Sequence, residues 1–167
     1  MSARQKEVIR AINNNDYQYL LDLGALDMPI DMNFPITSDG MTPLMLVCSF
    51  GNKIISQVII KNKGTDLEVV DEYGFNALYY ACINNHWKIV VELGKYRINF
   101  EASHEGTTCL HVACEKGYQE IVDVFLNYQQ KFPSWKKNHP WERQINVNAR
   151  KKHKSGNGVT PAFLAAK

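Results

Sequence analysis

The chain has 167 residues, of which 45% are hydrophobic, and its formal net charge at pH 7 is +2. This composition is that of a soluble, folded protein, and no apolar run approaches the ~18 residues of a membrane span. The first ten residues indicate neither a signal peptide nor a transit peptide, and there is no Asn-x-Ser/Thr glycosylation acceptor. We therefore expect a cytoplasmic protein.

Charge is distributed unevenly along the chain. Residues 1–126 carry 10 Lys and Arg against 16 Asp and Glu, a net charge of −6. Residues 127–167 carry 9 against 1, a net charge of +8. This asymmetry bears on the partners of the protein rather than on its fold.

The N-terminal segment is predicted to form two short helices. Ser2 is a suitable N-cap for a first helix that carries Val8 and Ile12 at helical spacing. A turn then leads to a return helix over residues 17–23. We interpret residues 1–37 as a capping unit, because an array of repeats needs a polar outer face.

Four later segments repeat one pattern, in which a glycine is followed two residues later by a small helix-capping residue. The intervals between the glycines are 34, 32 and 52 residues, so the last interval contains an insertion. A spacing of about 33 residues is typical of stacked helix-turn-helix repeats. The segments are GMTPLMLVCSFG from Gly40, GFNALYYACINN from Gly74, GTTCLHVACEKG from Gly106 and GVTPAFLAAK from Gly158.

Each repeat is predicted to begin a first helix at its capping residue and to end it at a residue that tolerates the left-handed conformation. A second helix follows, with apolar residues at helical spacing on one buried face. Since one unit cannot bury this face alone, neighbouring units must stack. The caps are Thr42, Asn76, Thr108 and Thr160, the helix ends are Gly51, Asn85 and Gly117, and the apolar residues include Ile54, Ile55, Ile89, Val90, Phe125 and Leu126.

Three short motifs carry a family resemblance. Residues 42–44 (Thr-Pro-Leu) and 110–113 (Leu-His-Val-Ala) resemble the first helix of the ankyrin repeat, and residues 145–149 (Ile-Asn-Val-Asn-Ala) resemble the stretch that leads into its finger. The resemblance implies an all-α ankyrin-repeat solenoid of paired antiparallel helices with short β-hairpin-like fingers. It also implies that His111 forms hydrogen bonds within and between units.

The repeats divide the chain into five parts. Because the sequence stops inside the first helix of a fifth unit, we expect further repeats or another chain to cover that end. The parts are a capping repeat at 1–37, repeat 2 at 38–71, repeat 3 at 72–103, repeat 4 at 104–154 with a basic aromatic insertion at 127–144, and an incomplete repeat 5 at 155–167.

Residue types that serve in catalysis, metal binding or disulfides are present, but they do not have the spacing that these functions need. Cys48, Cys82 and Cys114 recur at one place in successive units, where stacking separates them by ~8–10 Å, beyond the ~7 Å limit for a disulfide. The five histidines show no ligand spacing, and no phosphate-binding loop or nucleophile motif occurs. We predict no catalytic residue, no cofactor and no metal site.

Two surfaces are candidates for binding a partner. The resemblance implies a concave surface made of finger tips and the exposed side of the first helices, and large apolar residues there indicate a protein interface. The alternative is that one or two of them pack beneath the fingers. The residues predicted on this surface are Met41, Phe50, Tyr73, Phe75 and Ile83.

The second candidate is the basic segment with interleaved aromatic residues in and after the insertion. Such a segment suits an acidic protein surface, nucleic acid or an anionic membrane, and the alternative is a structural loop pinned by its tryptophans. Its leading residues are Trp135, Lys136, Lys137, Trp141, Lys151 and Lys152.

These features predict a non-enzymatic scaffold or adaptor that holds another protein on its concave surface, with the basic segment as a second contact. The alternatives are a module that binds nucleic acid or another polyanion, and a regulatory segment of a larger enzyme or channel. Repeat stacks bind unrelated targets, so the fold does not identify the partner.

Overall fold

The computed structural model describes residues 1–25, 31–96, 98–101, 106–127, 146, 148–150 and 158–162. Within these residues the chain forms eight α-helices and short connecting loops. The helices are α1 (Ala3–Asn13), α2 (Tyr17–Ala25), α3 (Pro43–Phe50), α4 (Lys53–Lys61), α5 (Ala77–Ile83), α6 (Trp87–Gly94), α7 (Cys109–Lys116) and α8 (Gln119–Leu126).

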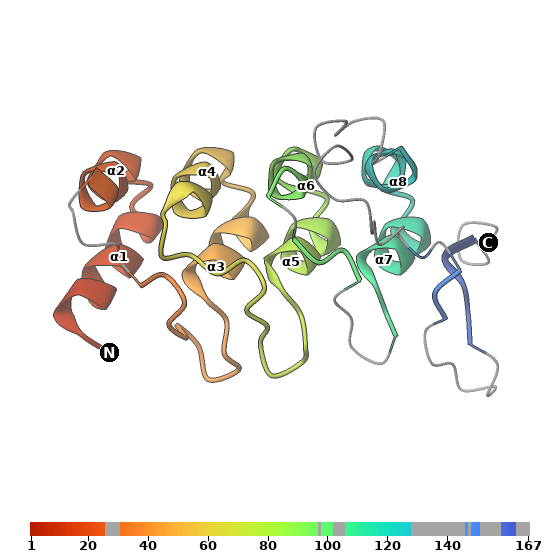
Figure 1. Ribbon diagram of the computed structural model, residues 1–167, viewed down its shortest axis with the longest axis horizontal. Helices are drawn as coiled ribbons and strands as arrows, with labels where there is room; N and C mark the ends of the chain where they lie inside the picture. Colours follow the sequence, from red (N-terminus) through yellow and green to blue (C-terminus); the bar gives the residue numbers. More distant parts are fainter. Residues whose placement is uncertain are drawn as a thin grey trace.

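The helices stack in two layers, as Figure 1 shows. The first helices α1, α3, α5 and α7 form one row, and the second helices α2, α4, α6 and α8 form another row alongside it. Each first helix contacts the second helix of its own unit, and contacts between neighbouring units join α3 to α5, α5 to α7, α4 to α6 and α6 to α8. The predicted all-α repeat solenoid is confirmed.

The loops that precede α3 and α5 project from the first-helix row as fingers, which we call the α3 finger (residues 34–42) and the α5 finger (residues 69–76). The backbone N–H of Glu72 in the α5 finger donates to the carbonyl oxygen of Asp39 in the α3 finger at 2.9 Å. Neighbouring fingers are therefore linked directly. None of the helices in the described part of the chain is long and apolar enough to span a membrane.

The predicted caps start the helices. In α1, the Ser2 hydroxyl accepts the backbone N–H of Gln5 at 3.2 Å, and the Gln5 side chain accepts the N–H of Ser2 at 2.7 Å. The Thr42 hydroxyl accepts the N–H of Met45 at 3.4 Å, and the side-chain oxygen of Asn76 caps α5 in the same way. Each cap satisfies a backbone donor that the helix itself leaves unpaired.

His111 joins α7 to the next repeat. Its Nδ1 accepts the backbone N–H of Thr108 at 3.2 Å, and its Nε2 lies 3.0 Å from the carbonyl oxygen of Val159. Because a carbonyl oxygen only accepts, Nε2 carries the proton and the fully buried imidazole is neutral. The hydrogen bonds within and between units that the family resemblance implies are confirmed.

The core lies between the two rows of helices and between neighbouring units. Ile55, Ile89 and Ile121 of successive second helices are each at most 1% exposed. Two predictions for this apolar face were wrong: Ile54 is 57% exposed and Leu126 is 60% exposed. Successive residues of a helix point about 100° apart, so a residue beside a buried position does not share its burial.

Hydrogen bonds at corresponding positions link successive units. In each case a backbone N–H donates to a side-chain oxygen of the preceding unit, which satisfies a polar group that the loop does not pair by itself. These bonds run from Asp66 to Asn33 at 2.7 Å, from Asn99 to Glu68 at 2.7 Å and from Asn146 to Glu101 at 2.9 Å.

The turn after α3 is packed against the turn before α6. Gly51 ends α3 with φ of +77°, and a Cβ atom added there would lie 2.4 Å from the imidazole ring of His86. Nε2 of His86 is also 3.1 Å from the carbonyl oxygen of Ser49. The glycine is therefore needed both for its backbone conformation and for the close approach of the next unit.

We expect Gly51→Ala to destabilise the fold more than Gly117→Ala. Gly117 also has a positive φ, of +69°, but nothing lies within 4 Å of a Cβ atom added there. Gly117→Ala should therefore cost only the ~1–2 kcal/mol of placing an alanine in the left-handed conformation. Urea denaturation followed by circular dichroism measures both losses. The double variant Gly51→Ala/His86→Ala should lose less stability than the sum of the two single variants. Equal losses in the two glycine variants would contradict the packing argument.

Glu92 is a buried carboxylate of α6 that is paired with Lys95. The Lys95 ammonium donates to Oε2 of Glu92 at 2.8 Å, and the Glu92 residue is 6% exposed. Burial alone would raise the pKa of Glu92, but hydrogen bonds from Lys95 and Gln57 and the nearby positive charges outweigh it and lower this pKa. Because Gln57 belongs to α4, the carboxylate also links two second helices.

Glu92 should contribute stability at neutral pH that is lost in acid. A pKa below the ordinary value means that folding favours the ionised form, so the contribution is present above that ordinary value and disappears as the pH falls through the folded-state pKa. We expect Glu92→Gln to cost roughly 1 kcal/mol at pH 7, and less as the pH falls below ~4. Urea denaturation across this range tests the effect, with exposed Glu120→Gln as the control. A loss that does not change with pH would exclude it.

Candidate functional site

The α5 finger is organised around the carboxylate of Asp71. Its Oδ1 accepts the backbone N–H groups of Tyr73 and Phe75, both at 2.9 Å, and its Oδ2 accepts the hydroxyl of Tyr80 at 2.6 Å. Asp71 is only 6% exposed, so these bonds replace the hydration that the buried carboxylate has lost. The finger backbone and helix α5 are held by one side chain.

Aromatic rings continue from this finger onto α5. The Phe75 ring stacks on the Tyr79 ring with a centroid distance of 3.7 Å and an interplanar angle of 8°, and the Tyr73 ring lies 6.5 Å from Phe75. The Tyr80 ring meets the Tyr79 ring edge to face at 6.3 Å. Four aromatic side chains thus form one contiguous cluster on the finger side of the stack.

The hydroxyls of Tyr79 and Tyr80 are held in their neutral form. Burial raises the pKa of Tyr80 well above its ordinary value, and the hydrogen bond to Asp71 adds to the effect. Burial is also the main cause that raises the pKa of Tyr79. Both rings therefore present neutral aromatic surface at physiological pH.

The predicted apolar residues divide into an exposed and a half-buried group. Phe50, the last residue of α3, is 62% exposed, and Tyr73 in the α5 finger is 50% exposed. Met41, Phe75 and Ile83 are half-buried and pack against the core. The five residues come from two neighbouring units, and two of them offer large side chains to solvent.

The residues predicted in the basic segment lie outside the described residues. They are Trp135, Lys136, Lys137, Trp141, Lys151 and Lys152.

The cysteines of this chain lie within the packing of the first helices. Cys48, Cys82 and Cys109 are buried free thiols, and Cys114 is half-buried. Burial raises the pKa of Cys48 and Cys114, and burial together with a hydrogen bond to Cys109 raises that of Cys82. Raised thiol pKa values disfavour the thiolate needed for nucleophilic or metal chemistry. Among the described residues, no group of three His, Cys, Asp or Glu side chains could hold a metal ion.

Sequence reasoning did not identify Asp71 and Tyr80 as residues of this surface. Asp71 stands three residues before Gly74, and Asp at this distance from Gly favours a turn. Its contact with Tyr80 joins residues nine apart and depends on how the finger folds back onto α5.

Comparison with known proteins agrees with this architecture. A family model described as ankyrin repeats in three copies matches residues 8–103 and residues 63–134. The chain belongs to the ankyrin-repeat family. Ankyrin repeats are protein-interaction modules, and solenoids of this kind present extended binding surfaces.

Two longer proteins are similar to this ankyrin-repeat chain. It is 27% identical over 119 residues to the target of rapamycin complex 2 subunit AVO2 of Saccharomyces cerevisiae, across 69% of this chain and 24% of the yeast protein. It is 31% identical over 87 residues to the probable E3 ubiquitin-protein ligase XBOS33 of Oryza sativa subsp. japonica, across 51% of this chain and 16% of the rice protein. The chain thus matches a quarter or less of each relative.

Asp71→Ala should destabilise the ankyrin stack because it leaves the N–H groups of Tyr73 and Phe75 and the Tyr80 hydroxyl without their acceptor. We expect a loss of ~1–3 kcal/mol in urea denaturation. Glu72→Ala, one residue along the same finger but exposed, should change stability by no more than about 0.5 kcal/mol. Similar losses in both variants would show that Asp71 does not organise the finger.

Proposed function

We propose that this protein is a cytoplasmic interaction scaffold that holds a partner protein on its finger surface and catalyses no reaction itself. The finger surface consists of the α3 and α5 fingers together with the exposed side of α3, α5 and α7. The observation that carries the proposal is the exposure of Phe50 and Tyr73, at 62% and 50%, on two adjoining units of this surface. Large aromatic side chains in such positions are typical of protein interfaces.

The other predicted residues support this surface from beneath. Met41, Phe75 and Ile83 are half-buried, so they fix the shape of the surface and offer only part of their area to a partner. The Ile83 carbonyl oxygen is also bonded, by the Lys116 ammonium at 3.2 Å. In this proposal Phe50 and Tyr73 make the main contacts and the half-buried residues position them.

We propose two further contacts that complete the scaffold. The basic segment, with Trp135, Lys136, Lys137, Trp141, Lys151 and Lys152, would provide a second contact for an acidic region of the partner, since residues 127–167 carry a net charge of +8. At the end of the described helix stack, exposed Leu126 and half-buried Val122 and Cys114 line one groove. Further repeats or another chain would cover this groove.

Site-specific photo-crosslinking tests the finger surface. A photoreactive phenylalanine analogue is placed in the full chain at position 50 or 73, and at positions 54 and 21 as controls. Ile54 on α4 is 57% exposed and Leu21 on α2 is 45% exposed, so the controls match in exposure but lie on second helices. We expect positions 50 and 73 to crosslink one common protein in a cell extract, and positions 54 and 21 not to crosslink it.

Affinity measurements with the crosslinked protein complete the test. Phe50→Ala/Tyr73→Ala should weaken its binding about tenfold or more, because aromatic residues at the centre of an interface are frequent hot spots. Ile54→Ala/Leu21→Ala should change it by less than about twofold. Binding that depends on the control pair, or on Lys151 and Lys152 alone, would contradict the proposal.

A further inference from the structure

The finger surface is acidic as well as aromatic. The segments 34–50, 69–86 and 106–117, which hold the α3 and α5 fingers and helices α3, α5 and α7, contain four carboxylates, and Lys116 is the only Lys or Arg within them. Those carboxylates are Asp39, Asp71, Glu72 and Glu115.

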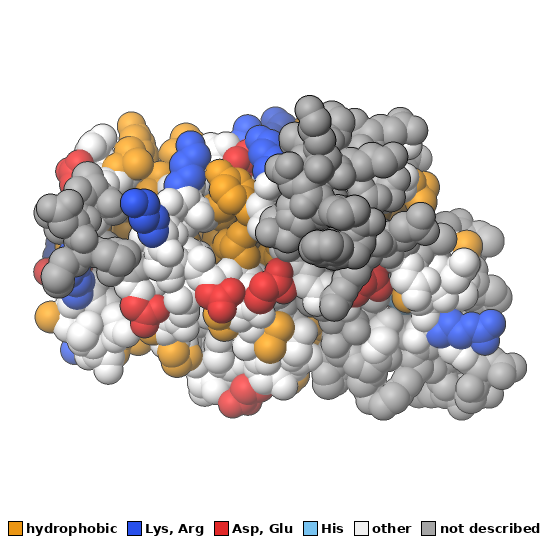
Figure 2. All heavy atoms as spheres, viewed as in Figure 1, with side chains coloured by type: hydrophobic (Ala, Val, Ile, Leu, Met, Phe, Trp, Pro, Cys, Tyr) orange, Lys and Arg blue, Asp and Glu red, His pale blue; other side chains and the backbone are white. Residues whose placement is uncertain are grey.

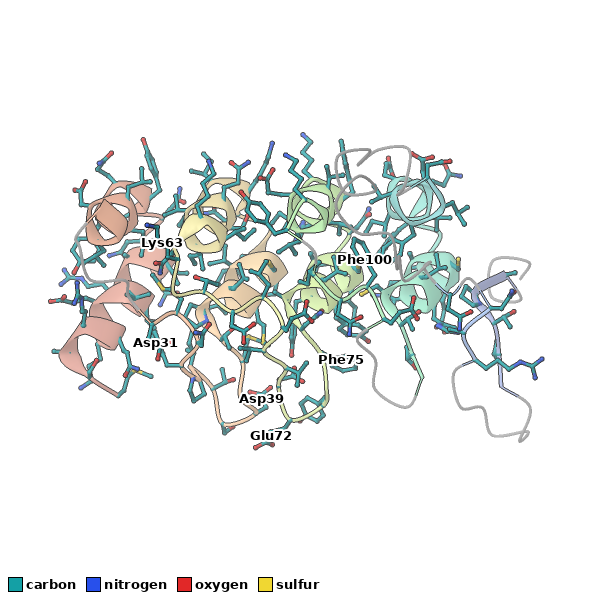
Figure 3. All side chains as sticks on the ribbon, in the orientation of Figure 1. Asp31, Asp39, Lys63, Glu72, Phe75 and Phe100 are labelled. Carbon is teal, nitrogen blue, oxygen red and sulfur yellow. The ribbon has the colours of Figure 1, made fainter. Side chains whose placement is uncertain are left out.

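The cations of the same units lie on the other layer. Figure 3 shows Asp39 and Glu72 at the tips of neighbouring fingers, whereas Lys63 lies beside the helices. On the face shown in Figure 2, Lys and Arg side chains gather over α4 and α6; most Asp and Glu side chains lie lower, toward the fingers, and some lie beside the second helices. Five lysines of units 2 and 3 belong to the second helices or to the residues just after them, namely Lys53, Lys61, Lys63, Lys88 and Lys95.

The four carboxylates differ in how far they are exposed. The Asp71 carboxylate accepts three hydrogen bonds and is buried. Glu72 and Glu115 are exposed and Asp39 is half-exposed. The Lys116 ammonium donates to the Ile83 carbonyl oxygen and lies 5.8 Å from the centroid of the Tyr118 ring, so contacts within the protein fix its position.

Carboxylates of the α3 finger, the α5 finger and α7 act on the same aromatic cluster. After burial and the hydrogen bond to Asp71, the charges of Asp71 and Asp39 raise the pKa of Tyr80 further. Glu115 on α7 contributes in the same sense to the raised pKa of Tyr79. The cluster therefore sits in a shared negative potential, which favours an approaching cation.

We infer that the finger surface binds a basic segment of a partner protein, in which Arg or Lys side chains alternate with large apolar ones. The apolar side chains would pack on Phe50 and Tyr73, and the cations would pair with Asp39, Glu72 and Glu115. A guanidinium group also suits the faces of exposed aromatic rings. This inference rests on the proposed function, because it assigns a ligand class to the same surface.

The same charges exclude a polyanion from this surface. Phosphate groups of nucleic acids and lipids would meet the carboxylates of Asp39 and Glu72 at the finger tips, which is unfavourable at short range. The acidic fingers and the basic segment at 127–157 therefore select opposite partner chemistries. A partner that engages both would need a basic apolar segment and a separate acidic region.

Peptide selection on the purified full chain tests the ligand class. Random displayed peptides of about twelve residues are selected against the wild-type protein, and peptides eluted by competition are sequenced and synthesised. We expect the selected pool to have net positive charge and to contain aromatic or aliphatic residues. Affinity of the synthetic peptides should fall as ionic strength rises.

Two triple variants with the same change in charge show where the peptides bind. Neutralising Asp39, Glu72 and Glu115 of the finger surface should weaken binding of the selected peptides about tenfold, whereas neutralising three carboxylates of second helices should change it by less than about twofold. The variants are Asp39→Asn/Glu72→Gln/Glu115→Gln and Asp22→Asn/Glu120→Gln/Asp123→Asn.

The outcomes separate this inference from the proposed function. A neutral apolar pool that still depends on Phe50 and Tyr73 would overturn the basic ligand and leave the interaction surface in place. An acidic pool whose binding is unchanged in the finger-surface triple variant would also overturn it, since such peptides would bind elsewhere on the chain. If Phe50→Ala/Tyr73→Ala did not change the affinity of the selected peptides, both the basic ligand and the proposed interaction surface would be overturned.

Discussion

Burial of apolar faces between neighbouring units is the constraint on which the rest of this structure depends. Ile55, Ile89 and Ile121 lie on corresponding second helices and are almost completely buried. Each of these helices packs against only one other helix of its own unit, so neighbouring units supply the rest of the burial. Full burial of such a side chain contributes about 1.5–3 kcal/mol, so the contacts between units contribute much of the folding free energy. Because stacking fixes the direction of the first helices, it also fixes the direction in which the fingers project.

The fingers hold their shape through polar contacts rather than a core of their own. Asp71 binds two backbone N–H groups and the Tyr80 hydroxyl, and the Glu72 backbone donates to Asp39 in the neighbouring finger. These bonds restrain the backbone before any partner arrives. A surface that is ordered in advance loses less conformational entropy on binding, which favours affinity.

The finger surface differs in charge from the second helices of units 2 and 3. The α3 and α5 fingers and helices α3, α5 and α7 combine exposed aromatic side chains with carboxylates, while lysines such as Lys53 and Lys88 lie on α4 and α6. The overall charge of +2 conceals this division, since it sums groups that face different directions and includes residues 127–167, which carry a net charge of +8. Partner selection depends on the local arrangement of charge and not on the total.

The sequence by itself determined the repeat architecture. Capping residues such as Thr42 and left-handed turns such as Gly51 act over three or four residues, so their structural consequences are local and were predicted correctly. Only the tertiary structure decided that Phe50 is exposed while Phe75 packs on Tyr79, and that Asp71 reaches Tyr80. Burial and side-chain contacts depend on which neighbouring unit covers each position, and a pattern read along one chain does not contain that geometry.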